Sequence, residues 1–298
     1  MDKDPSNDLY VSLLRWMTRR EARSTVGYMT HRATRGLGAR AERLDRAVAA
    51  VQTRCAPMFP GGEIQDAGRA IWTLSSTPLL VANGVIRYDA TDFHGPAGER
   101  DLDCCLAVLS TYDVPWRFSA WEHLGAEVLV PHLIARGMVG TDSAQAMWLD
   151  LRGRAQATAG EDGIDVRPAN TASYHQVWTE IFTTVFGIPS NYADVFEQMV
   201  ARADSYGLVA YANDRPVGCL SIEMEQGLAV VDNIGVLPSA RRRGVGGRLL
   251  EAAHDLAAAR GAKASVVVAT PAGSGVCTRL GYHAVTSVEY LTPAPLLV

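Results

Sequence analysis

The chain has 298 residues, of which 48% are hydrophobic, and a formal net charge of −4 at pH 7. This length allows two domains of ordinary size, and the apolar content is that of a globular protein rather than a disordered one. No apolar run is long enough to span a bilayer, no secretory leader is recognisable, and the slight acidity argues against a nucleic-acid partner. The five cysteines are odd in number and lack metal-ligand spacing, so we expect reduced thiols, a cytoplasmic location and no metal site.

The first half of the chain is typical of alternating helices and short strands. Its apolar periodicity predicts, in chain order, helices at 8–30 and 39–54, a turn-rich stretch at 57–66, strands at 70–76 and 79–88, a helix at 98–111, a strand at 114–121, a helix at 125–136 and a strand at 144–151. The first helices are rich in arginine, which predicts a solvated basic face, with contact to an acidic partner or to nucleic acid as the alternative. The small, polar segment 152–163 is the best linker candidate.

The second half is predicted to form one complete domain. The expected elements are a strand at 164–168, helices at 171–185 and 191–203, strands at 207–212, 216–225 and 227–236, a helix from Val245 to Arg260, a strand at 264–270, a closing helix and a final strand. This order of elements fits an α+β sandwich with a mixed sheet.

The stretch LPSARRRGVGGRLL at 237–250 places an arginine run before a glycine-rich turn that begins a helix. The first amides of a helix are unpaired and lie at the positive end of its dipole, so this turn is a candidate anion site. The glycines let the backbone approach the anion closely, and the arginines add charge. A solvated basic turn is the alternative. The candidate anion-binding residues are Arg241, Arg242, Arg243, Gly244, Val245, Gly246, Gly247 and Arg248.

The spacing of this turn matches neither the dinucleotide-binding nor the nucleoside-triphosphate motif. Residues 241–246 (RRRGVG) instead resemble [RQ]-x-x-G-x-[GA], the acyl-CoA pyrophosphate signature of the GNAT acyltransferase superfamily. The preceding VLP at 236–238 and the later TRLGY at 278–282 resemble the family's V-x-P turn and its YxxLGF close. The resemblance covers residues 164–291 and implies an acyl-CoA site at the turn.

The first half resembles a degenerate copy of the same domain, as in paired-domain members of the family. The segment STPLLVANGVIRYDATDF resembles the second and third strands, and the segment that begins YDVPWRFSAW resembles the fourth strand and a shortened helix. The pyrophosphate turn would then fall at 121–125, where WEHLG offers one glycine beside the acidic Glu122. We therefore expect tandem GNAT-like sandwiches, with a degenerate domain at 1–151, a linker at 152–163 and an acyl-CoA-binding domain at 164–298.

The resemblance implies an N-acetyltransferase that uses acetyl-CoA as co-substrate. The amine of a small molecule would attack the thioester directly in a ternary complex, with no nucleic-acid or membrane partner, and a homodimer is possible. The backbone of Ile234, Gly235 and Val236 would pair with the pantetheine arm, and Thr270 on the next strand is assigned to the same site. Independently, Gly235 inside a strand indicates a β-bulge or a close backbone approach.

A base must deprotonate the attacking amine, and Asp232 is the first candidate. Strict alternation places Asp232 on one face with Leu228, where burial would raise the pKa of the carboxyl; a bulge would reverse the alternation and expose it. Glu223 is the alternative base, although an acid near a strand end is usually solvated. His175 and His254 are expected at the surface.

Cys277 takes the position of the family's tyrosine acid, four residues before the glycine of the closing motif. Its thiol could protonate the departing CoA or accept the acyl group transiently, and a buried structural cysteine is the alternative. Because this tyrosine is missing, a non-catalytic acyl-CoA-binding sensor or scaffold is the competing functional hypothesis.

Overall fold

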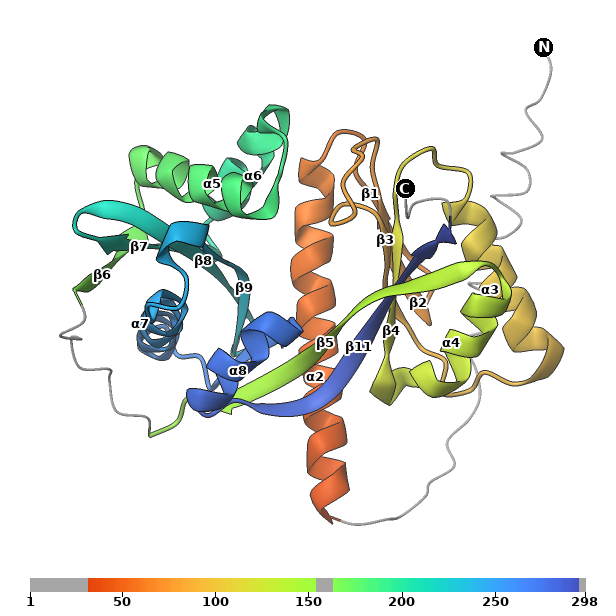
Figure 1. Ribbon diagram of the computed structural model, residues 1–298. Helices are drawn as coiled ribbons and strands as arrows, with labels where there is room; N and C mark the ends of the chain where they lie inside the picture. Colours follow the sequence, from red (N-terminus) through yellow and green to blue (C-terminus); the bar gives the residue numbers. More distant parts are fainter. Residues whose placement is uncertain (1–31, 154–162, 295–298) are drawn as a thin grey trace. The chain divides into compact units, whose positions relative to one another are not determined.

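Two compact units make up the chain in the computed structural model, which describes residues 32–153 and 163–294 (Figure 1). Unit 1 comprises residues 1–45, 52–143 and 286–298, and unit 2 comprises residues 46–51 and 144–285. The helix predicted at 8–30 and most of the predicted linker lie outside the described residues.

The first half of the chain has the helices and strands predicted for its described residues, with shifted ends, and a short strand in the stretch predicted as turns. The elements are α2 (Arg32–Cys55), η1 (Ala56–Met58), β1 (Glu63–Asp66), β2 (Ala70–Leu74), β3 (Gly84–Tyr88), α3 (Gly95–Leu109), β4 (Arg117–Trp121), η2 (Glu122–Leu124), α4 (Ala126–Ala135) and β5 (Met138–Asp150).

The second half also has the predicted order of elements. They are β6 (Ile164–Ala169), α5 (Ala172–Phe186), η3 (Ser190–Tyr192), α6 (Ala193–Val200), β7 (Ser205–Ala212), β8 (Arg215–Glu225), β9 (Leu228–Val236), η4 (Pro238–Ala240), α7 (Val245–Ala259), β10 (Ala264–Ala269), α8 (Pro271–Arg279) and β11 (His283–Pro293).

Strands β5 and β11 cross the boundary that the sequence predicts between two contiguous domains. Residues 145–150 of β5 pair with β10 and belong to unit 2, and residues 288–291 of β11 pair with β4 and belong to unit 1. The strand order is β1-β2-β3-β4-β11 in unit 1 and β5-β10-β9-β8-β7-β6 in unit 2. Each half of the chain therefore supplies strand residues to the sheet formed mainly by the other half.

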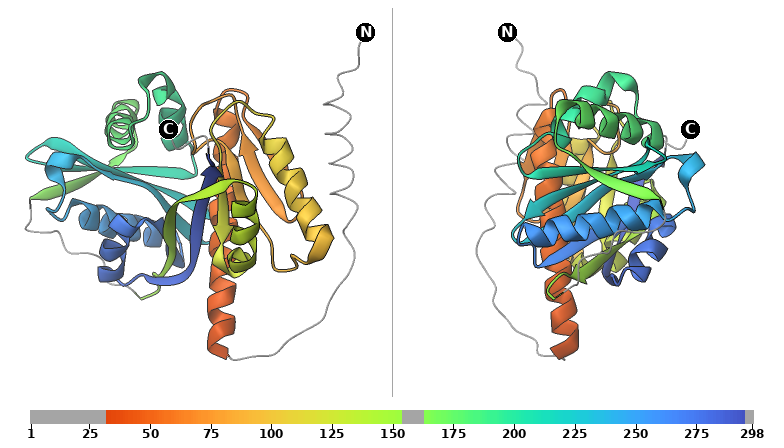
Figure 2. Two further views of the ribbon diagram at one scale, coloured as in Figure 1. Left: turned by 45° about the vertical axis from the view of Figure 1, so that its right-hand side comes forward. Right: turned by 90° about the vertical axis from the view of Figure 1, so that its left-hand side faces the viewer.

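In unit 2, helices α5 and α6 cover one face of the sheet and α7 covers the other (Figure 2). Helix α7 buries Val245, Leu249 and Ala253 at the predicted spacing, and these side chains join the core of the unit. The helix is followed by Gly261, whose φ of +83° is the left-handed conformation that glycine adopts without strain. The packing of α7 places its N-terminus at the predicted anion-binding turn.

Each unit contains a parallel strand pair that is joined by a helix. In unit 2, α7 joins β9 to β10, and in unit 1, α3 joins β3 to β4. The counterpart of the 237–247 turn is thus the segment 89–94, which corrects the sequence assignment to 121–125. This segment has two acidic residues and no glycine, and the carboxylate of Asp89 accepts hydrogen bonds from the amide and hydroxyl of Thr91. Its charge opposes anion binding.

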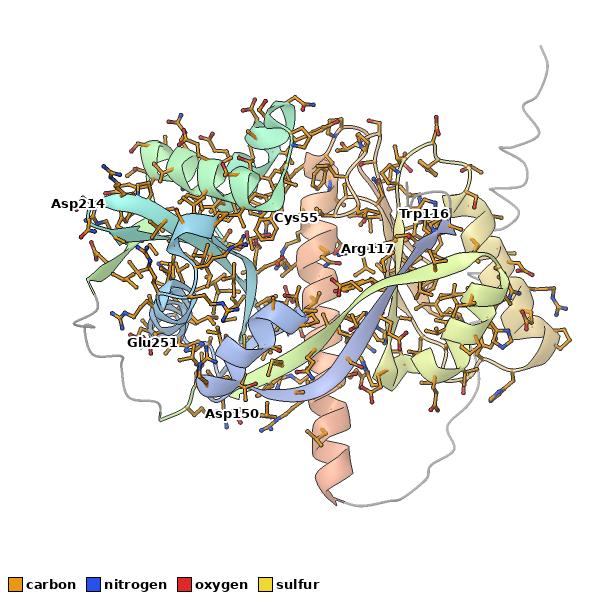
Figure 3. The ribbon with its side chains drawn as sticks, in the orientation of Figure 1. Cys55, Trp116, Arg117, Asp150, Asp214 and Glu251 are labelled. Carbon is orange, nitrogen blue, oxygen red and sulfur yellow. The ribbon has the colours of Figure 1, made fainter. Side chains whose placement is uncertain are left out.

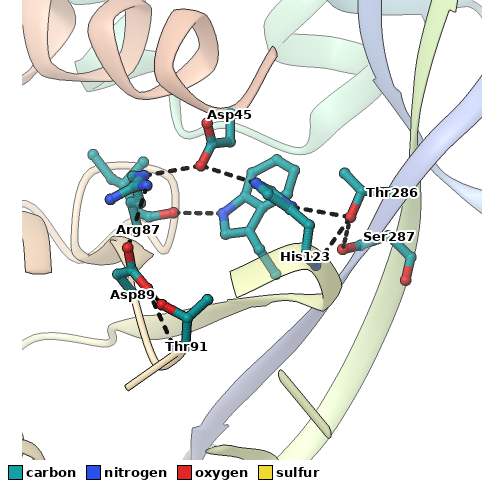
Figure 4. A network of polar contacts seen from close by, with 9 residues as sticks. Asp45, Arg87, Asp89, Thr91, His123, Thr286 and Ser287 are labelled. Carbon is teal, nitrogen blue, oxygen red and sulfur yellow. Dashed lines mark hydrogen bonds and ion pairs between the residues drawn. The ribbon is translucent and has the colours of Figure 1, made fainter. Parts of the chain in front are cut away.

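A buried polar network ties α2 to β3 and η2 in unit 1 (Figure 4). Oδ2 of Asp45 lies 2.8 Å from Nε of Arg87 and 3.2 Å from Nε2 of His123. Nδ1 of His123 lies 3.0 Å from the hydroxyl of Thr286. Asp45 is only 1% exposed. Because a buried carboxylate is stable only with partners, these contacts specify where this part of α2 packs.

Candidate active site

A β-bulge interrupts β9 beside the residues expected to bind the thioester. Leu220 of β8 faces two residues of β9, Asn233 and Ile234, where a regular ladder would have one. Asn233 has a φ of +56°, and its side-chain amide donates a 2.9 Å hydrogen bond to Oγ of Ser221. The predicted bulge is confirmed, and it lies just before Gly235.

Strands β9 and β10 separate next to this bulge. Their parallel pairing ends at Val231 and Val267. Beyond that point, β9 continues to Val236 against β8, and β10 continues to Ala269 against β5. The β10-facing edge of residues 232–236 therefore has no partner strand in the described part of the chain. Backbone groups on such an edge are available to a ligand that carries its own amides.

The turn before α7 has left-handed backbone at Arg242 (φ +62°) and Gly244 (φ +83°). Residues in this conformation direct neighbouring amides to one side, which is the geometry of an anion-binding nest. Gly244 is the N-cap of α7 and has no side chain that could cap the first amides of the helix. Nε of Arg241 donates to the carbonyl oxygen of Val236 at 3.0 Å, so the turn is tied to the end of β9.

Gly246 and Gly247 have open space in front of them in the first turn of α7. A Cβ on Gly247 would meet no described atom within 4 Å, and one on Gly246 would meet only Cγ2 of Val236 at 4.0 Å. Glycine inside a helix costs roughly 0.5–1 kcal/mol relative to alanine. The packing of the described residues does not require glycine at either position. A ligand lying close against the first turn of α7 would account for glycine at both positions.

The positive charge at this turn comes mainly from Arg241, Arg242 and Arg243, which are all exposed. Arg248 is half-buried, and its Nη1 lies 2.8 Å from Oε2 of Glu251 one helical turn later, which offsets its charge. Glu251 is labelled on α7 in Figure 3. The three exposed arginines are consistent with a site that presents amides and positive charge to an anion from solvent.

Thr270 is exposed at the N-cap of α8, directly after β10. It therefore lies just beyond the end of β10 that separates from β9.

The packing of α5 accounts for glycine at position 235. A Cβ there would lie 3.2 Å from Cγ1 of Val185 and 3.3 Å from both Sγ of Cys219 and Cε2 of Phe186. Contacts this short force neighbouring atoms to shift. The close approach predicted at Gly235 is thus made by the chain itself, on the face of the sheet that α5 covers.

Asp232 is exposed, so the predicted burial of this carboxylate is wrong. Residues 228–232 pair one-to-one with β8, so Asp232 keeps the parity of the buried Leu228, yet it is exposed at the point where the bulge begins. Its Oδ1 accepts a 2.8 Å hydrogen bond from the amide of Asn233, which stabilises the left-handed conformation at the bulge. The carboxylate is accessible from solvent.

Glu223 is buried in β8 rather than solvated as expected. Its Oε2 lies 2.9 Å from Nη2 of Arg202, and the same nitrogen lies 2.7 Å from the carboxylate of Asp204. The side chain of Glu223 is 4% exposed. A carboxylate held in this way links β8 to the segment that precedes β7 and is poorly placed to receive a proton from a ligand.

Cys277 lies in the core of unit 2 and is 2% exposed. Burial raises the pKa of its thiol to about 11. The thiol is therefore protonated at neutral pH and packed among apolar side chains, as in the structural alternative.

His254 is buried in α7, which corrects the predicted surface position, and His175 is half-buried. Nε2 of His254 lies 2.9 Å from the hydroxyl of Tyr282, and that hydroxyl lies 2.6 Å from Oγ of Ser265. The signal for this network is in the sequence, because His254 follows the buried Leu250 by four residues on the inner face of the helix.

None of the described helices is long and apolar enough to cross a membrane. Over residues 32–153 and 163–294, no group of three or more histidine, cysteine, aspartate or glutamate side chains is arranged to hold a metal ion.

Comparisons with known proteins agree with this geometry. Residues 171–282 match the family model "Acetyltransferase (GNAT) family". A GCN5-related N-acetyltransferase from Kribbella flavida has a TM-score of 0.60 at 16% identity, covering 89% of this chain and 96% of that chain. One from Sphaerobacter thermophilus has a TM-score of 0.58 at 15% identity, covering 86% and 92%. A tandem GNAT protein from the clavulanic acid biosynthesis pathway has a TM-score of 0.56 at 13% identity, covering 98% and 95%.

The search of curated proteins gives no match. At these identities the solved structures show the fold alone, which is the predicted α+β fold of tandem GNAT-like sandwiches. The turn, the bulge and the separation of β9 from β10 all lie within residues 171–282, which form a domain of the acetyltransferase (GNAT) family.

Proposed function

We propose that this protein is an N-acetyltransferase that transfers an acetyl group from acetyl-CoA to the amine of a small molecule, by direct attack in a ternary complex. The family of residues 171–282 supports acyl transfer in general, and the donor and the acceptor are our proposal. The observation that carries it is the glycine-rich N-terminus of α7, tied through Arg241 to the end of β9, where β9 has no partner strand toward β10 among the described residues.

Residues of the turn and of β9 would share the binding of the donor. The amides of residues 244–247 and the exposed side chains of Arg241, Arg242 and Arg243 would hold the diphosphate. Backbone groups of residues 234–236 would hold the pantetheine arm along the free edge of β9, and Thr270 would border the same opening from β10. Acetyl-CoA would supply the acyl group as a thioester. Fixed positions for both reactants contribute most of the rate in such a reaction.

Asp232 is the general base in this proposal. An alkyl ammonium has a pKa of about 10 and must lose a proton before its nitrogen can attack. Asp232 lies at the bulge, next to the residues assigned to the thioester, and its exposed carboxylate can reach a ligand directly or through a water. We assign Glu223 to the ion pair with Arg202 instead, because its carboxylate is buried and held.

Departure of the thiolate does not need an acid from this chain. A thiolate leaves readily because its conjugate acid has a pKa near 8.5. Cys277 is buried, and the raised pKa of its thiol makes it a weaker acid than the group that it would protonate. We therefore propose that Cys277 packs the core and takes no part in proton transfer.

A non-catalytic acyl-CoA-binding sensor or scaffold is the second candidate. The burial of Cys277 favours it, since the position of the family's acid holds a residue that cannot reach a ligand. Both candidates bind acetyl-CoA, and only the enzyme releases free thiol when an amine is present.

Calorimetry with acetyl-CoA tests the site. We expect the intact chain to bind at one site and the Gly246→Glu, Gly247→Glu double variant to lose binding, because two carboxylates would occupy the anion site. These positions have room for side chains, so the variant should remain folded by circular dichroism. Gly38→Glu is the matched control, since Gly38 is an exposed helical glycine in α2 with nothing described within 4 Å.

Two results would contradict the proposal. If the intact chain binds neither acetyl-CoA nor CoA, the turn is a solvated basic turn. If it binds acetyl-CoA but releases no thiol with any member of a panel of amino sugars, amino acids and polyamines, the sensor replaces the enzyme.

A further inference from the structure

Phe186 stands out among the apolar side chains of unit 2. It is 47% exposed, and it is the only large hydrophobic residue that is exposed in the described part of this unit. It is the last residue of α5, next to Gly187, whose φ of +65° ends the helix. An isolated exposed phenylalanine needs no explanation by itself. The contacts of this ring, however, place it beside the candidate active site.

The ring of Phe186 packs against buried aromatic side chains of α5. Its centroid lies 4.8 Å from that of Phe182, which is stacked on Trp178 at 5.1 Å. Phe182 and Trp178 are both buried. A ring at the end of a packed aromatic ladder is restrained in position, so it presents a defined apolar wall rather than a mobile side chain.

This wall borders the site on β9. Cε2 of Phe186 lies 3.3 Å from the position of a Cβ on Gly235. Gly235 is flanked by Ile234 and Val236, whose edge toward β10 has no strand partner among the described residues. Helix α5 lies on the face of the sheet opposite α7 (Figure 2). A donor anchored at the N-terminus of α7 and laid along this edge has its reactive end beside the α5 face.

We propose that Phe186 determines which acyl chain length this protein accepts, by closing the acyl end of the site beside Gly235. This inference rests on the proposed binding of acyl-CoA. The occupant that fits the wall is a short, uncharged acyl group. Val185, whose Cγ1 lies 3.2 Å from the same Cβ position on Gly235, is also apolar, so these two side chains offer no cationic partner for an acyl carboxylate.

Calorimetry with free CoA, acetyl-CoA and hexanoyl-CoA tests this assignment without any acceptor amine. For the intact chain we expect acetyl-CoA to bind more tightly than hexanoyl-CoA. In Phe186→Ala the preference should shift toward hexanoyl-CoA by about tenfold or more, because the removed ring leaves room for additional methylene groups. Affinity for free CoA should stay unchanged, since CoA has no acyl group. Phe186→Trp should shift the preference the opposite way.

Thr184→Ala is the control, an exposed position on the same helix whose variant should keep the preference of the intact chain. If Phe186→Ala and Phe186→Trp are folded, bind CoA normally and keep that preference too, the role of Phe186 is overturned and the proposed function stands. If the intact chain binds none of the three compounds, the proposed function fails, and the assignment of Phe186 fails with it.

Discussion

Nε1 of Trp178 donates a 2.9 Å hydrogen bond to the carbonyl oxygen of Leu220, the β8 residue that faces the bulge in β9. The bulge takes Leu220 out of one-to-one pairing, and a buried carbonyl needs a donor. The indole of α5 supplies that donor. The bulge in β9 is therefore stabilised by Trp178, a buried side chain of α5 that donates to the β8 carbonyl opposite the bulge.

We expect Trp178→Phe to lower the free energy of unfolding and to loosen the bulge. Loss of the indole N–H leaves the Leu220 carbonyl unsatisfied, at a cost of about 1–3 kcal/mol, in addition to the loss of packing. Urea unfolding measures the total, and amide exchange at residues 232–236 reports on the bulge. Trp72→Phe is the control, because Trp72 is as deeply buried but its indole nitrogen has no hydrogen-bond partner in the structure. Equal protection of the bulge in both variants would contradict the role of Trp178.

We expect Asp232→Asn to lower kcat by about 10²- to 10⁴-fold with little change in acetyl-CoA affinity, because the base acts on the amine. Steady-state kinetics with the best amine from the panel, together with calorimetry, separate the two effects. Asp194→Asn on α6 is the control for loss of an exposed carboxylate. Full activity of Asp232→Asn would remove Asp232 from the mechanism.

Stability should fall as the pH rises from about 9 to about 11, in part because of Cys277. The thiol ionises near its ordinary pKa of 9.0 in the unfolded chain, whereas burial holds its pKa near 11 in the fold. Between these values the native state binds more protons than the unfolded state, so rising pH favours unfolding. Urea unfolding across this range should show a shallower pH dependence for Cys277→Ala.

Val276→Ala controls for the lost packing, since Val276 lies on the same helix, contacts the same core and does not titrate. Val276→Ala should lower the free energy of unfolding at every pH, and its pH dependence should equal that of the intact chain. An unchanged slope in Cys277→Ala would mean that the thiol is not desolvated in the native protein.

Asp45→Ala should cost about 3–5 kcal/mol of unfolding free energy, because it leaves the buried Arg87 without its nearest carboxylate. Asp45→Asn, which retains an acceptor, should cost less. Asp165→Ala, which breaks an exposed ion pair with Arg167, should cost far less, because solvent screens this pair. Similar values for Asp45→Ala and Asp165→Ala in urea unfolding would show that the Asp45 network contributes no more than a surface pair.

A fragment of residues 164–298 should be less stable than a fragment of residues 144–298. The shorter fragment lacks residues 145–150, which pair with all of β10, so β10 would become an exposed edge. Size-exclusion chromatography and thermal unfolding by circular dichroism compare the two fragments. If both fragments are equally stable, residues 145–150 of β5 are dispensable to unit 2.

Local signals made the elements and the glycine-rich turn before α7 predictable. The apolar spacing of α7, the glycine after it and the arginines before it are properties of neighbouring residues, and the structure has the helix and the turn where they were expected. The bulge in β9 was also foreseen, from a glycine inside a strand. Its position at Asn233 was not, because the register depends on which residues of β8 lie opposite.

The side-chain assignments failed where they depended on long-range packing. Asp232 is exposed although regular pairing gives it the same parity as the buried Leu228, so alternation along the strand does not by itself decide its burial. Glu223 is buried because Arg202, distant in sequence, reaches its carboxylate. The counterpart turn in the first half was misplaced because only strand pairing shows that β3 and β4 are the parallel pair.

The amino-acid order determines the helices, the strands and the chemistry of the turn at 241–248, since hydrophobic periodicity, capping and backbone freedom act over a few residues. Only the tertiary structure decides that β9 and β10 separate beyond Val231, that residues of β5 and β11 complete the sheets of different units, and that Phe186 lies against Gly235. Each of these depends on residues far apart in the chain, which pack together in ways that local propensity does not specify.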